Sequence, residues 1–529
     1  MQKTTKPPPA ICVAAHHKSV RELMADNEFR ALANQPGFLI ELRLDFFNDL
    51  TDASLSRAMD QFAPNAVATF RHPAEGGMRK DVSDAERLHF LQLAVNRGAS
   101  FVDIEARTPR DGFNKRAARL IVSHHEFSRP LSYDELRGIW LKQSSQGVAD
   151  VIKVVSMPKS ILDTVPVLRL LDELQNMPRA SQVERISGAK VNLPTPLFLC
   201  MGEFGAWTRI LAGRFGEPFT FARSENAPGT APGQLTWREM DELYRFRAIT
   251  ETTPIYGVIG NPIAHSLSPL LHNTAFKEMQ EDGVYVPFLV DCNPAEFVRA
   301  FGTILKGLSV TIPHKESALA ACQHLDPSAK AIGAVNTLVR ASESSAGLHP
   351  EWLGLNTDAP AAADALESAL GSLSGKQILI LGAGGAARAI AFGVKERGAT
   401  VMLLNRTRER AQNLARDVGA TVIADSDLAK VKIDAIVNAT PVGMQPNVDA
   451  SPLEESQIPP GVLVYDTVYN PQRTKLLELA EKRGCRTLEG VSMFIGQGVR
   501  QFERWTGKNA PREAMERAVL DELKKRRSQ

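Results

Sequence analysis

The chain has 529 residues, more than one hydrophobic core normally supports, so about three domains are expected. Its 62 lysines and arginines nearly balance 60 aspartates and glutamates, and no long run of one sign occurs, which argues against a nucleic-acid partner. The five cysteines are scattered, odd in number and never in a CxxC pair, so we expect no disulfide framework and no metal.

The first ten residues, MQKTTKPPPA, are polar and proline-rich with no apolar segment behind them. No apolar run elsewhere reaches the length of a membrane span. We therefore expect a soluble, cytoplasmic protein. The sequence does not indicate an oligomeric state.

Eight short, apolar, β-prone runs occupy the first half of the chain, each followed by a segment with helical spacing. They are ICVAA from Ile11, FLIELRL from Phe38, AVATF from Ala66, FVDIE from Phe101, LIVS from Leu120, VIKVV from Val151, PLFLCM from Pro196 and FTFA from Phe219. Eight parallel strands alternating with helices over roughly 250 residues are typical of a (β/α)8 TIM barrel. A doubly wound sheet would give a similar pattern, so periodicity alone does not decide between them.

Polar residues inside or after these runs are expected to gather at one end of the barrel. They are Glu41, Arg43, Arg71, Asp103, Glu105, His124, His125, Lys153 and Arg209. Because the carboxyl ends of barrel strands hold the active site, this distribution indicates chemistry. The alternative is that several of them, Asp103 and Glu105 above all, are core ion pairs that seal the barrel end.

Lys153 is the most informative of these residues. The run VIKVV places its ammonium in an apolar strand, where desolvation favours the neutral amine, a nucleophile toward ketones. A lysine that reaches solvent, or a buried salt bridge to Glu105, explains the pattern equally well.

The motifs ELRLDFF, FRHPAEGG, VDIE, SHHEF, ADVIKVVSMP and TAPGQ, in this order, resemble type I 3-dehydroquinate dehydratase over essentially the whole first half. The resemblance implies that Lys153 forms an imine with the substrate ketone, that His125 transfers the proton and that Glu75 orients His125. The neighbouring His124 leaves an ambiguity, and alignment of the following EF pair favours His125. The residues that the resemblance assigns to substrate binding are Glu41, Arg43, Arg71, Arg209, Thr230 and Gln234.

A second α/β unit begins at IYGVIG, after a boundary near residues 251–254. Within it, LGAGGAAR satisfies the GxGxxG/A fingerprint through Gly382, Gly384 and Ala387, between a predicted strand and a predicted helix. At the end of the next strand, where NAD-binding sheets carry an acidic residue, the chain has Asn405-Arg406-Thr407, followed by Arg410. This positive charge favours the 2′-phosphate of NADP.

The motifs GNPIAHSLSPLLHN, VTIPHK, GAVNTL, LNTDA, NATPVGM and MFIGQG resemble shikimate dehydrogenase. The resemblance implies that Lys315 and Asp358 form the catalytic pair, since a cationic donor stabilises the alkoxide left by hydride transfer. Without the resemblance, Lys315 would be read as a solvated lysine and Asp358 as a helix cap before Pro360. Ala359 departs from the glycine of many relatives. The implied substrate-binding residues are Ser266, Ser268, Thr311, Asn336, Tyr469 and Gln497, and those implied for NADP are Gly382, Ala383, Gly384, Gly385, Ala386, Asn405, Arg406, Thr407, Arg410 and Thr440.

We therefore expect an α/β protein with three domains. Residues 1–250 form the dehydratase barrel, residues 254–358 completed by C-terminal helices in 492–529 form a substrate-binding domain, and residues 359–491 form a Rossmann-type NADP-binding domain. The expected substrates are 3-dehydroquinate, 3-dehydroshikimate and shikimate. Two alternatives are a quinate-oriented dehydrogenase and a regulatory sensor, although a sensor would be expected to have lost Lys153, His125, Lys315 and Asp358, all of which are present.

Overall fold

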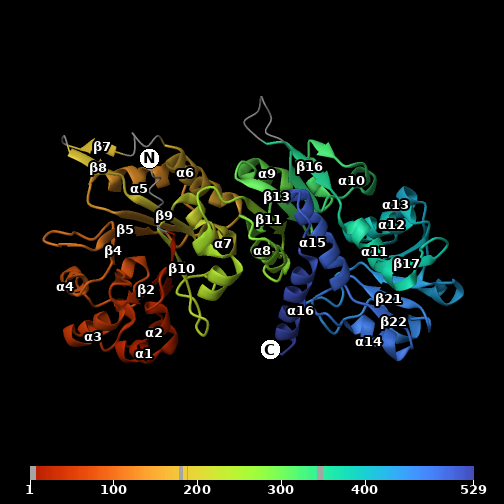
Figure 1. Ribbon diagram of the computed structural model, residues 1–529, viewed down its shortest axis with the longest axis horizontal. Coiled ribbons are helices and arrows are strands. Elements are labelled where there is room, and N and C mark those ends of the chain that lie inside the picture. Colours follow the sequence, from red (N-terminus) through yellow and green to blue (C-terminus); the bar gives the residue numbers. More distant parts are fainter. Residues whose placement is uncertain (1–7, 178–182, 187–188, 342–349, 529) are drawn as a thin grey trace. The chain divides into compact units, whose positions relative to one another are not determined.

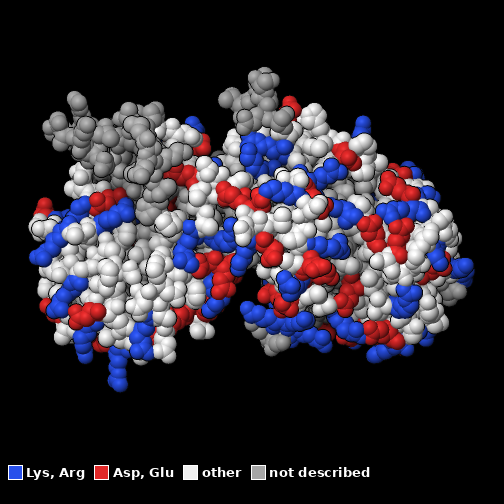
Figure 2. Space-filling model, viewed as in Figure 1, with Lys and Arg blue, Asp and Glu red and all other residues white. Residues whose placement is uncertain are grey.

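The structure is a computed structural model that describes residues 8–177, 183–186, 189–341 and 350–528. The chain divides into two compact units whose main boundary lies between Pro254 and Ile255 (Figure 1). On the face drawn in Figure 2, basic and acidic side chains are interspersed over both units. This mixture agrees with the formal net charge of +2.

The first unit is a nearly closed barrel of eight parallel strands in the order β10-β1-β2-β3-β4-β5-β6-β9. Residues from all eight strands contribute to one apolar cluster, so the strands surround a common interior. All eight runs expected from the sequence form these strands, and the barrel is confirmed over the doubly wound alternative. The strands are β1 (Ala10–Ala14), β2 (Phe38–Arg43), β3 (Ala66–Thr69), β4 (Phe101–Glu105), β5 (Arg119–His125), β6 (Val151–Ser156), β9 (Thr195–Cys200) and β10 (Phe219–Ala222).

Helices between the strands cover the outside of the barrel, as Figure 1 shows for α3 to α6. Local signals set their ends: α5 begins with a capping box in which Ser132 and Glu135 satisfy each other's backbone N–H groups. The helices are α1 (Val20–Ala25), α2 (Asn27–Ala33), α3 (Asp52–Phe62), α4 (Asp84–Asn96), α5 (Tyr133–Ser145), α6 (Val165–Asn176) and α7 (Ala206–Ile210). A hairpin of β7 (Val183–Ile186) and β8 (Ala189–Asn192) was not expected from the sequence.

Alternation along the strands explains how the barrel positions polar groups. Val151 and Val155 of β6 belong to the interior cluster, so Lys153 between them points to the same side. By the same parity Asp103 follows Phe101 on β4, and Ser123 and His125 follow Ile121 on β5. An apolar layer therefore fills one end of the interior and a polar layer lies toward the carboxyl ends of the strands.

The second unit contains two sheets, except that Val286–Cys292, which overlap one strand of the first sheet, group with the first unit. The first sheet has the order β12-β11-β13-β15-β16-β14, with β15 antiparallel to its neighbours β13 and β16. Its strands are β11 (Ile255–Gly260), β12 (Val284–Leu289), β13 (Leu305–Val310), β14 (His324–Leu325), β15 (Thr337–Arg340) and β16 (Trp352–Leu355), and its helices are α8 (Ser268–Glu278), α9 (Pro294–Phe301) and α10 (Pro327–Ile332).

The other sheet is parallel and has the order β19-β18-β17-β20-β21-β22, which is the 3-2-1-4-5-6 order of a dinucleotide-binding fold. Separate apolar clusters on its two faces show that helices cover both sides. The strands are β17 (Gln377–Leu381), β18 (Thr400–Leu404), β19 (Thr421–Val422), β20 (Ala435–Asn438), β21 (Leu463–Asp466) and β22 (Arg486–Leu488). The helices are α11 (Asp358–Leu370), α12 (Gly385–Glu396), α13 (Arg408–Val418) and α14 (Lys475–Lys482).

Two C-terminal helices follow: α15 (Val491–Thr506) packs against α11, α8, β13 and β15, and α16 (Arg512–Ser528) packs against α8 and α15. Trp505 of α15 donates a hydrogen bond from Nε1 to the Leu338 carbonyl at 3.0 Å. A side chain at Gly307 would meet the Trp505 ring at 2.3 Å, so the close approach of helix and strand depends on this glycine.

Candidate active sites

Lys153 lies in the middle of β6 and points into the barrel. Its side chain is 6% exposed, and Nζ donates a hydrogen bond to Asp103 Oδ2 at 3.1 Å. Nζ also lies 4.2 Å from the centre of the Phe221 ring. The lysine therefore does not reach solvent, and its ion-pair partner is Asp103, not Glu105. The buried carboxylate offsets part of the cost of burying the lysine charge.

Asp103 and Glu105 belong to a fully buried ion network. Arg71 binds Asp103 Oδ2 through Nη2 at 2.8 Å and Glu105 Oε1 through Nη1 at 3.0 Å. Arg87 of α4 donates to Glu105 as well. Burial alone would raise the pKa of Asp103, but Arg71 and Lys153 outweigh it and hold that pKa well below its usual range. Asp103 is thus a carboxylate that helps to place the lysine.

His125 and Glu75 form a second buried pair, each with a side chain 7% exposed. Glu75 Oε2 accepts the backbone N–H of His125 at 3.1 Å and lies 2.9 Å from Nδ1. Burial, reinforced by the charges of Arg71 and Lys153, holds the pKa of His125 well below its usual value. The imidazole is therefore neutral near pH 7 and available as a base. Burial also raises the pKa of Glu75 to about 7.

His124 points away from this pair, because successive residues of a strand face opposite sides. The charged groups that act on it are Glu126, Arg107 and Arg129, none of which is a predicted site residue. The geometry therefore supports the choice of His125 as the imidazole of the site.

Arg209 of α7 is a buried cation for which no carboxylate partner exists among the described residues. It is 2% exposed, its Nε makes no hydrogen bond, and burial lowers its pKa to about 10. A buried charge normally has a partner, and here an anionic ligand would supply it. Glu41 and Arg43, by contrast, are already engaged: Glu41 accepts from Thr69 at 2.9 Å, and Arg43 binds both oxygens of Asp45 at 3.0 and 2.9 Å.

Thr230 and Gln234 lie on residues 224–235, the loop that follows β10. Gln234 Oε1 accepts hydrogen bonds from Thr230 Oγ1 at 3.3 Å and from the Ala231 N–H at 3.2 Å. The Gly202 N–H donates to the Pro232 carbonyl at 3.1 Å, which ties the loop to the end of β9. Because the loop follows the carboxyl end of a barrel strand, it lies at the same end as the polar layer.

In the second unit Lys315 Nζ donates to Asp358 Oδ2 at 2.6 Å, with the two side chains 16% and 5% exposed. Reading Lys315 as a solvated lysine is therefore wrong. Asp358 is the first residue of α11 and not its cap, and Asn356 Oδ1 accepts its backbone N–H at 3.1 Å. Ala359 lies in the first turn of α11 and is buried, so an alanine fits this position without strain.

Asn336 is buried in a hydrogen-bond network next to this pair. Its Nδ2 donates to Thr357 Oγ1 at 2.9 Å, and its Oδ1 accepts the Thr357 N–H at 2.8 Å. Gln501 of α15 donates to the Asn336 carbonyl at 3.1 Å. The network therefore fixes Thr357, the residue directly before Asp358.

Ser266 and Ser268 flank the start of α8, and Ser266 Oγ accepts the Ser268 N–H at 3.3 Å. Burial raises the pKa of Tyr469, which follows β21 of the other sheet, and the Leu267 backbone and the Ser266 side chain lie near enough to lower that pKa in part. The two sheets therefore bring these three predicted residues together.

Thr311 and Gln497 are two predicted substrate-binding residues whose hydrogen bonds with described residues do not connect them to the predicted catalytic pair. The Thr311 N–H donates to the Ile259 carbonyl at 3.0 Å, and Gln497 Nε2 donates to the Phe494 carbonyl at 2.9 Å. Among the hydrogen bonds between described residues, none joins either side chain to Lys315 or Asp358.

The turn from β17 into α12 fits a dinucleotide pyrophosphate. Gly382 has φ +117°, which favours glycine, and a side chain at Gly384 would meet nothing within 4 Å. No side chain caps the N-terminus of α12, so its first N–H groups are open to an anion. A side chain at Gly385 would lie 3.0 Å from Lys315 Cβ, so this turn lies beside the Lys315–Asp358 pair.

The residues after β18 fit a 2′-phosphate. Arg406 and Arg410 are exposed, and within the described part of the chain neither forms an ion pair. Asn405 Nδ2 donates to the Thr407 carbonyl at 2.8 Å, which shapes the turn between them. Farther along the sheet, Thr440 Oγ1 donates to Asn438 Oδ1 at 2.7 Å.

Several residues of the barrel site were not singled out from the sequence. Asp45, which holds Arg43, lies only two positions after it, so this spacing could have revealed the pair. Arg87 lies in a helix and gave no local signal. Ser123, which donates to Asp103 at 2.6 Å, looks like an ordinary strand residue.

In the described part of the chain, no helix has both the length and the apolar character that crossing a membrane requires. Family models match four segments of the chain. Type I 3-dehydroquinase matches residues 11–251, the shikimate dehydrogenase substrate binding domain residues 258–338, shikimate / quinate 5-dehydrogenase residues 364–457, and the shikimate 5'-dehydrogenase C-terminal domain residues 490–520.

Individual proteins match the chain over different lengths. A chloroplastic bifunctional 3-dehydroquinate dehydratase/shikimate dehydrogenase from Arabidopsis thaliana is 34% identical over 96% of this chain and 84% of its own length. A shikimate dehydrogenase (NADP(+)) from Methanopyrus kandleri is 43% identical over 52% of this chain and 98% of its own. The solved shikimate 5-dehydrogenase from Thermus thermophilus, in complex with NADP(H) and shikimate, is 34% identical with a TM-score of 0.46, over 51% of this chain and 99% of its own.

Proposed function

The chain belongs to the family of bifunctional 3-dehydroquinate dehydratase/shikimate dehydrogenase enzymes, and from this premise we propose which of its residues carry out the two reactions. It dehydrates 3-dehydroquinate to 3-dehydroshikimate and reduces that product to shikimate with NADPH. The observation that carries the assignment is that each unit holds a largely buried lysine–carboxylate pair among its predicted site residues, Lys153–Asp103 in the first and Lys315–Asp358 in the second.

Dehydration begins when Lys153, after losing a proton, attacks the ketone carbon and expels water to form a protonated imine. The imine withdraws electrons, so the adjacent carbon becomes acidic and His125 removes its proton. The electron pair then expels the neighbouring hydroxyl, which leaves as water after His125 returns the proton. Hydrolysis of the imine releases the product. Glu75 supports this exchange by holding Nδ1 of His125.

Substrate recognition in the barrel divides between charge and hydrogen bonding. Arg209, a buried cation with no carboxylate partner among the described residues, binds the substrate carboxylate together with Thr230 and Gln234. The polar layer of Glu41, Arg43 and Arg71 binds the hydroxyl groups.

The reduction is carried out at Lys315. When bound, NADPH supplies a hydride to the ketone carbon. Lys315 donates a proton to the oxygen that becomes negative, and Asp358 orients the lysine. Ser266, Ser268 and Tyr469 bind the substrate carboxylate, while Thr311, Asn336 and Gln497 bind its hydroxyls.

The residues that hold the cofactor belong to three turns of the parallel sheet. Backbone N–H groups of residues 383–386 bind the pyrophosphate after Gly382, and Arg406 and Arg410 bind the 2′-phosphate, with Asn405 and Thr407 beside them. Thr440 follows β20, and a side chain at Gly382 would lie 3.1 Å from its Cγ2, so Thr440 borders the glycine turn.

Three domains carry these sites in our proposal: residues 1–250, residues 254–358 with 492–529, and residues 359–491. We also assign the enzyme to the cytoplasm, because its cysteines are free thiols, as a reducing compartment keeps them. Localisation of a tagged full chain tests this assignment, and an organellar signal would contradict it.

The function is tested by incubating the protein with 3-dehydroquinate and NADPH while following enone absorbance and NADPH together. Without NADPH, the enone should accumulate; with NADPH, it should be consumed as NADPH is oxidised. Parallel assays with quinate and shikimate test the alternative of a quinate-oriented dehydrogenase. We expect shikimate to be oxidised faster than quinate. Absence of the enone, or oxidation of NADPH without it, contradicts the proposal.

A further inference from the structure

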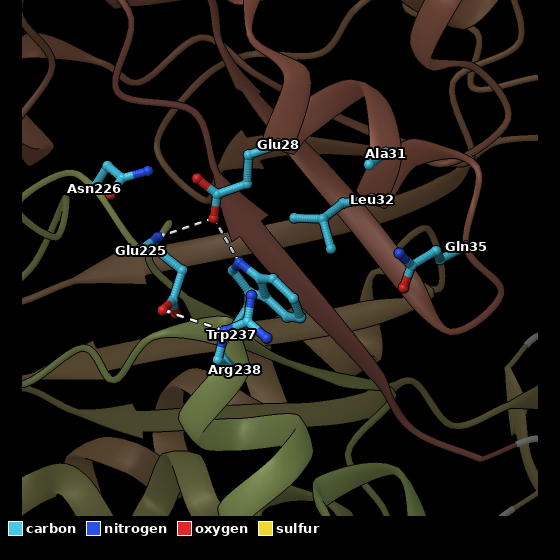
Figure 3. A pocket seen from close by; sticks show the side chains of 8 residues that line it. All are labelled: Glu28, Ala31, Leu32, Gln35, Glu225, Asn226, Trp237 and Arg238. Atoms are coloured by element: carbon cyan, nitrogen blue, oxygen red, sulfur yellow. Dashed lines mark hydrogen bonds and ion pairs between the residues drawn. The ribbon is translucent and has the colours of Figure 1, made fainter. Parts of the chain in front are cut away.

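A pocket of about 460 Å³ lies in the first unit between α2 and residues 225–238. Figure 3 shows Glu28 pointing from α2 toward two of the residues that line it. Glu28 Oε1 accepts a hydrogen bond from the Glu225 N–H at 2.9 Å and another from Trp237 Nε1–H at 2.5 Å. A single side-chain oxygen of Glu28 thus binds two donors, from Glu225 and Trp237, that are separated along the chain.

These two donors stand at the two ends of the loop formed by residues 224–235. The base of the loop is closed by backbone bonds at 2.9 Å from the Arg223 N–H to the Leu235 carbonyl and from the Trp237 N–H to the Arg223 carbonyl. Glu28 adds a side-chain clamp across the same base. The loop carries Thr230 and Gln234, so its conformation decides where these side chains lie.

No cation among the described residues pairs with Glu28 and competes with its two hydrogen-bond donors. Arg238, the nearby cation in Figure 3, pairs with Glu225 Oε2 at 3.4 Å and with Glu242 Oε1 at 2.8 Å. The Trp237 ring meets Phe38 edge-on at 5.6 Å between centroids, so the indole that Glu28 holds is itself packed against β2.

We propose that Glu28 is a positioning residue of the dehydratase: by clamping both ends of residues 224–235, it keeps Thr230 and Gln234 in the substrate-binding arrangement. The inference rests on the substrate-binding roles proposed above for these two residues. Lys153 and His125 lie on β6 and β5, and no hydrogen bond between described residues joins Glu28 to either strand, so its loss should affect substrate binding more than chemistry.

The expected change in KM follows from the fraction of molecules in which residues 224–235 hold Thr230 and Gln234 in the substrate-binding arrangement. If removal of the clamp lowers the fraction of closed loop to about one tenth, the apparent affinity for 3-dehydroquinate falls about tenfold. Glu28→Ala should therefore raise KM about tenfold while kcat changes less than about twofold. Glu28→Gln should restore most of the affinity, since one amide oxygen can accept both hydrogen bonds.

Three measurements serve as controls. Shikimate dehydrogenase kinetics of the same variants report on the second unit and should not change. Glu22→Ala on α1 removes an exposed carboxylate whose one hydrogen bond with a described residue is to the Lys18 N–H at 2.9 Å, and should leave the dehydratase unchanged. Trp237→Phe removes one of the two donors but keeps an aromatic ring, and should raise KM in the same direction as Glu28→Ala.

A double-mutant cycle with Gln234→Ala tests the mechanism itself. If Glu28 acts through the loop, adding Glu28→Ala to Gln234→Ala should raise KM far less than the product of the single effects. Multiplicative effects, or an unchanged KM in both Glu28→Ala and Trp237→Phe, would overturn the proposal. If Gln234→Ala alone leaves KM unchanged, the substrate-binding role of Gln234 fails instead, which is a different result.

Discussion

Replacing Arg209 with methionine should strengthen the fold of the first unit while weakening its activity. The pKa of Arg209, lowered by burial to about 10, corresponds to roughly 3 kcal/mol of unfavourable free energy for holding the charge without a ligand. Arg209→Met removes that charge at similar volume, so the substrate-free first unit should gain up to about 3 kcal/mol in unfolding free energy. The lost charge-assisted bonds to the substrate carboxylate, worth roughly 1.5 to 3 kcal/mol each, should raise KM for 3-dehydroquinate about a hundredfold.

Arg43→Met is the matched control, because the same substitution should have the opposite effect on stability. Arg43 is paired with Asp45, which is 1% exposed and would remain as a buried carboxylate without its cation. Breaking such a pair typically costs about 3 to 5 kcal/mol. Hydrogen exchange of peptides from β6 and β9, measured in the full chain, reports the stability of the first unit. Destabilisation by Arg209→Met together with an unchanged KM would refute the reasoning.

The remaining predictions concern the imine, the cofactor and the stability of the second unit. Borohydride reduction in the presence of 3-dehydroquinate should attach the substrate to Lys153, as read by peptide mass spectrometry; labelling elsewhere, or full dehydratase activity in Lys153→Ala, would exclude the imine. Arg406→Ala combined with Arg410→Ala should erode the preference for NADPH over NADH, because each arginine can form hydrogen bonds to the 2′-phosphate worth roughly 1.5 to 3 kcal/mol; an unchanged ratio of kcat/KM values would contradict the assigned pocket. His272 is fully buried and burial lowers its pKa from 6.5 to about 3, so the stability that its neutral form contributes is present above pH 6.5 and is lost as pH falls toward 3. His272→Phe should therefore flatten the acid loss of unfolding free energy between pH 6.5 and 4, and an unchanged slope in chemical unfolding would show that His272 is not its source.

The eight strands of the barrel, and the two strands beside the glycine fingerprint, could be predicted from the sequence for a physical reason. A parallel strand in a barrel or doubly wound sheet is covered on both faces, so it reads as a short, almost continuous apolar run. Lys153 stood out because it interrupts such a run, and the structure shows that it points inward. The glycine fingerprint was predictable in the same way, since Gly382 requires a backbone conformation that other residues rarely adopt.

Partners that meet across the barrel could not be predicted, because their contacts are set by tertiary packing. Arg87 lies in α4, where it resembles a surface arginine of an amphipathic helix, yet it is 1% exposed and binds Glu105. Glu28 likewise contacts residues about two hundred positions away in the chain.

The seam of the barrel is another feature that only the structure reveals. In the order of the sheet, β9 and β10 stand at opposite ends. Glu217 bridges toward β9 by accepting the Phe198 N–H at 2.7 Å, and burial raises the pKa of Glu217 well above its usual value. A glutamate before a strand carries no sequence signal for this role.

The central claim is that two separate lysine sites act in order on one pathway, and product analysis of two variants tests it most directly. Lys315→Ala should consume 3-dehydroquinate at the normal rate and accumulate 3-dehydroshikimate, with little NADPH oxidised. Lys153→Ala should leave 3-dehydroquinate untouched while still reducing added 3-dehydroshikimate. If Lys315→Ala abolishes dehydration in a folded protein, the two sites are not separate and the account is wrong.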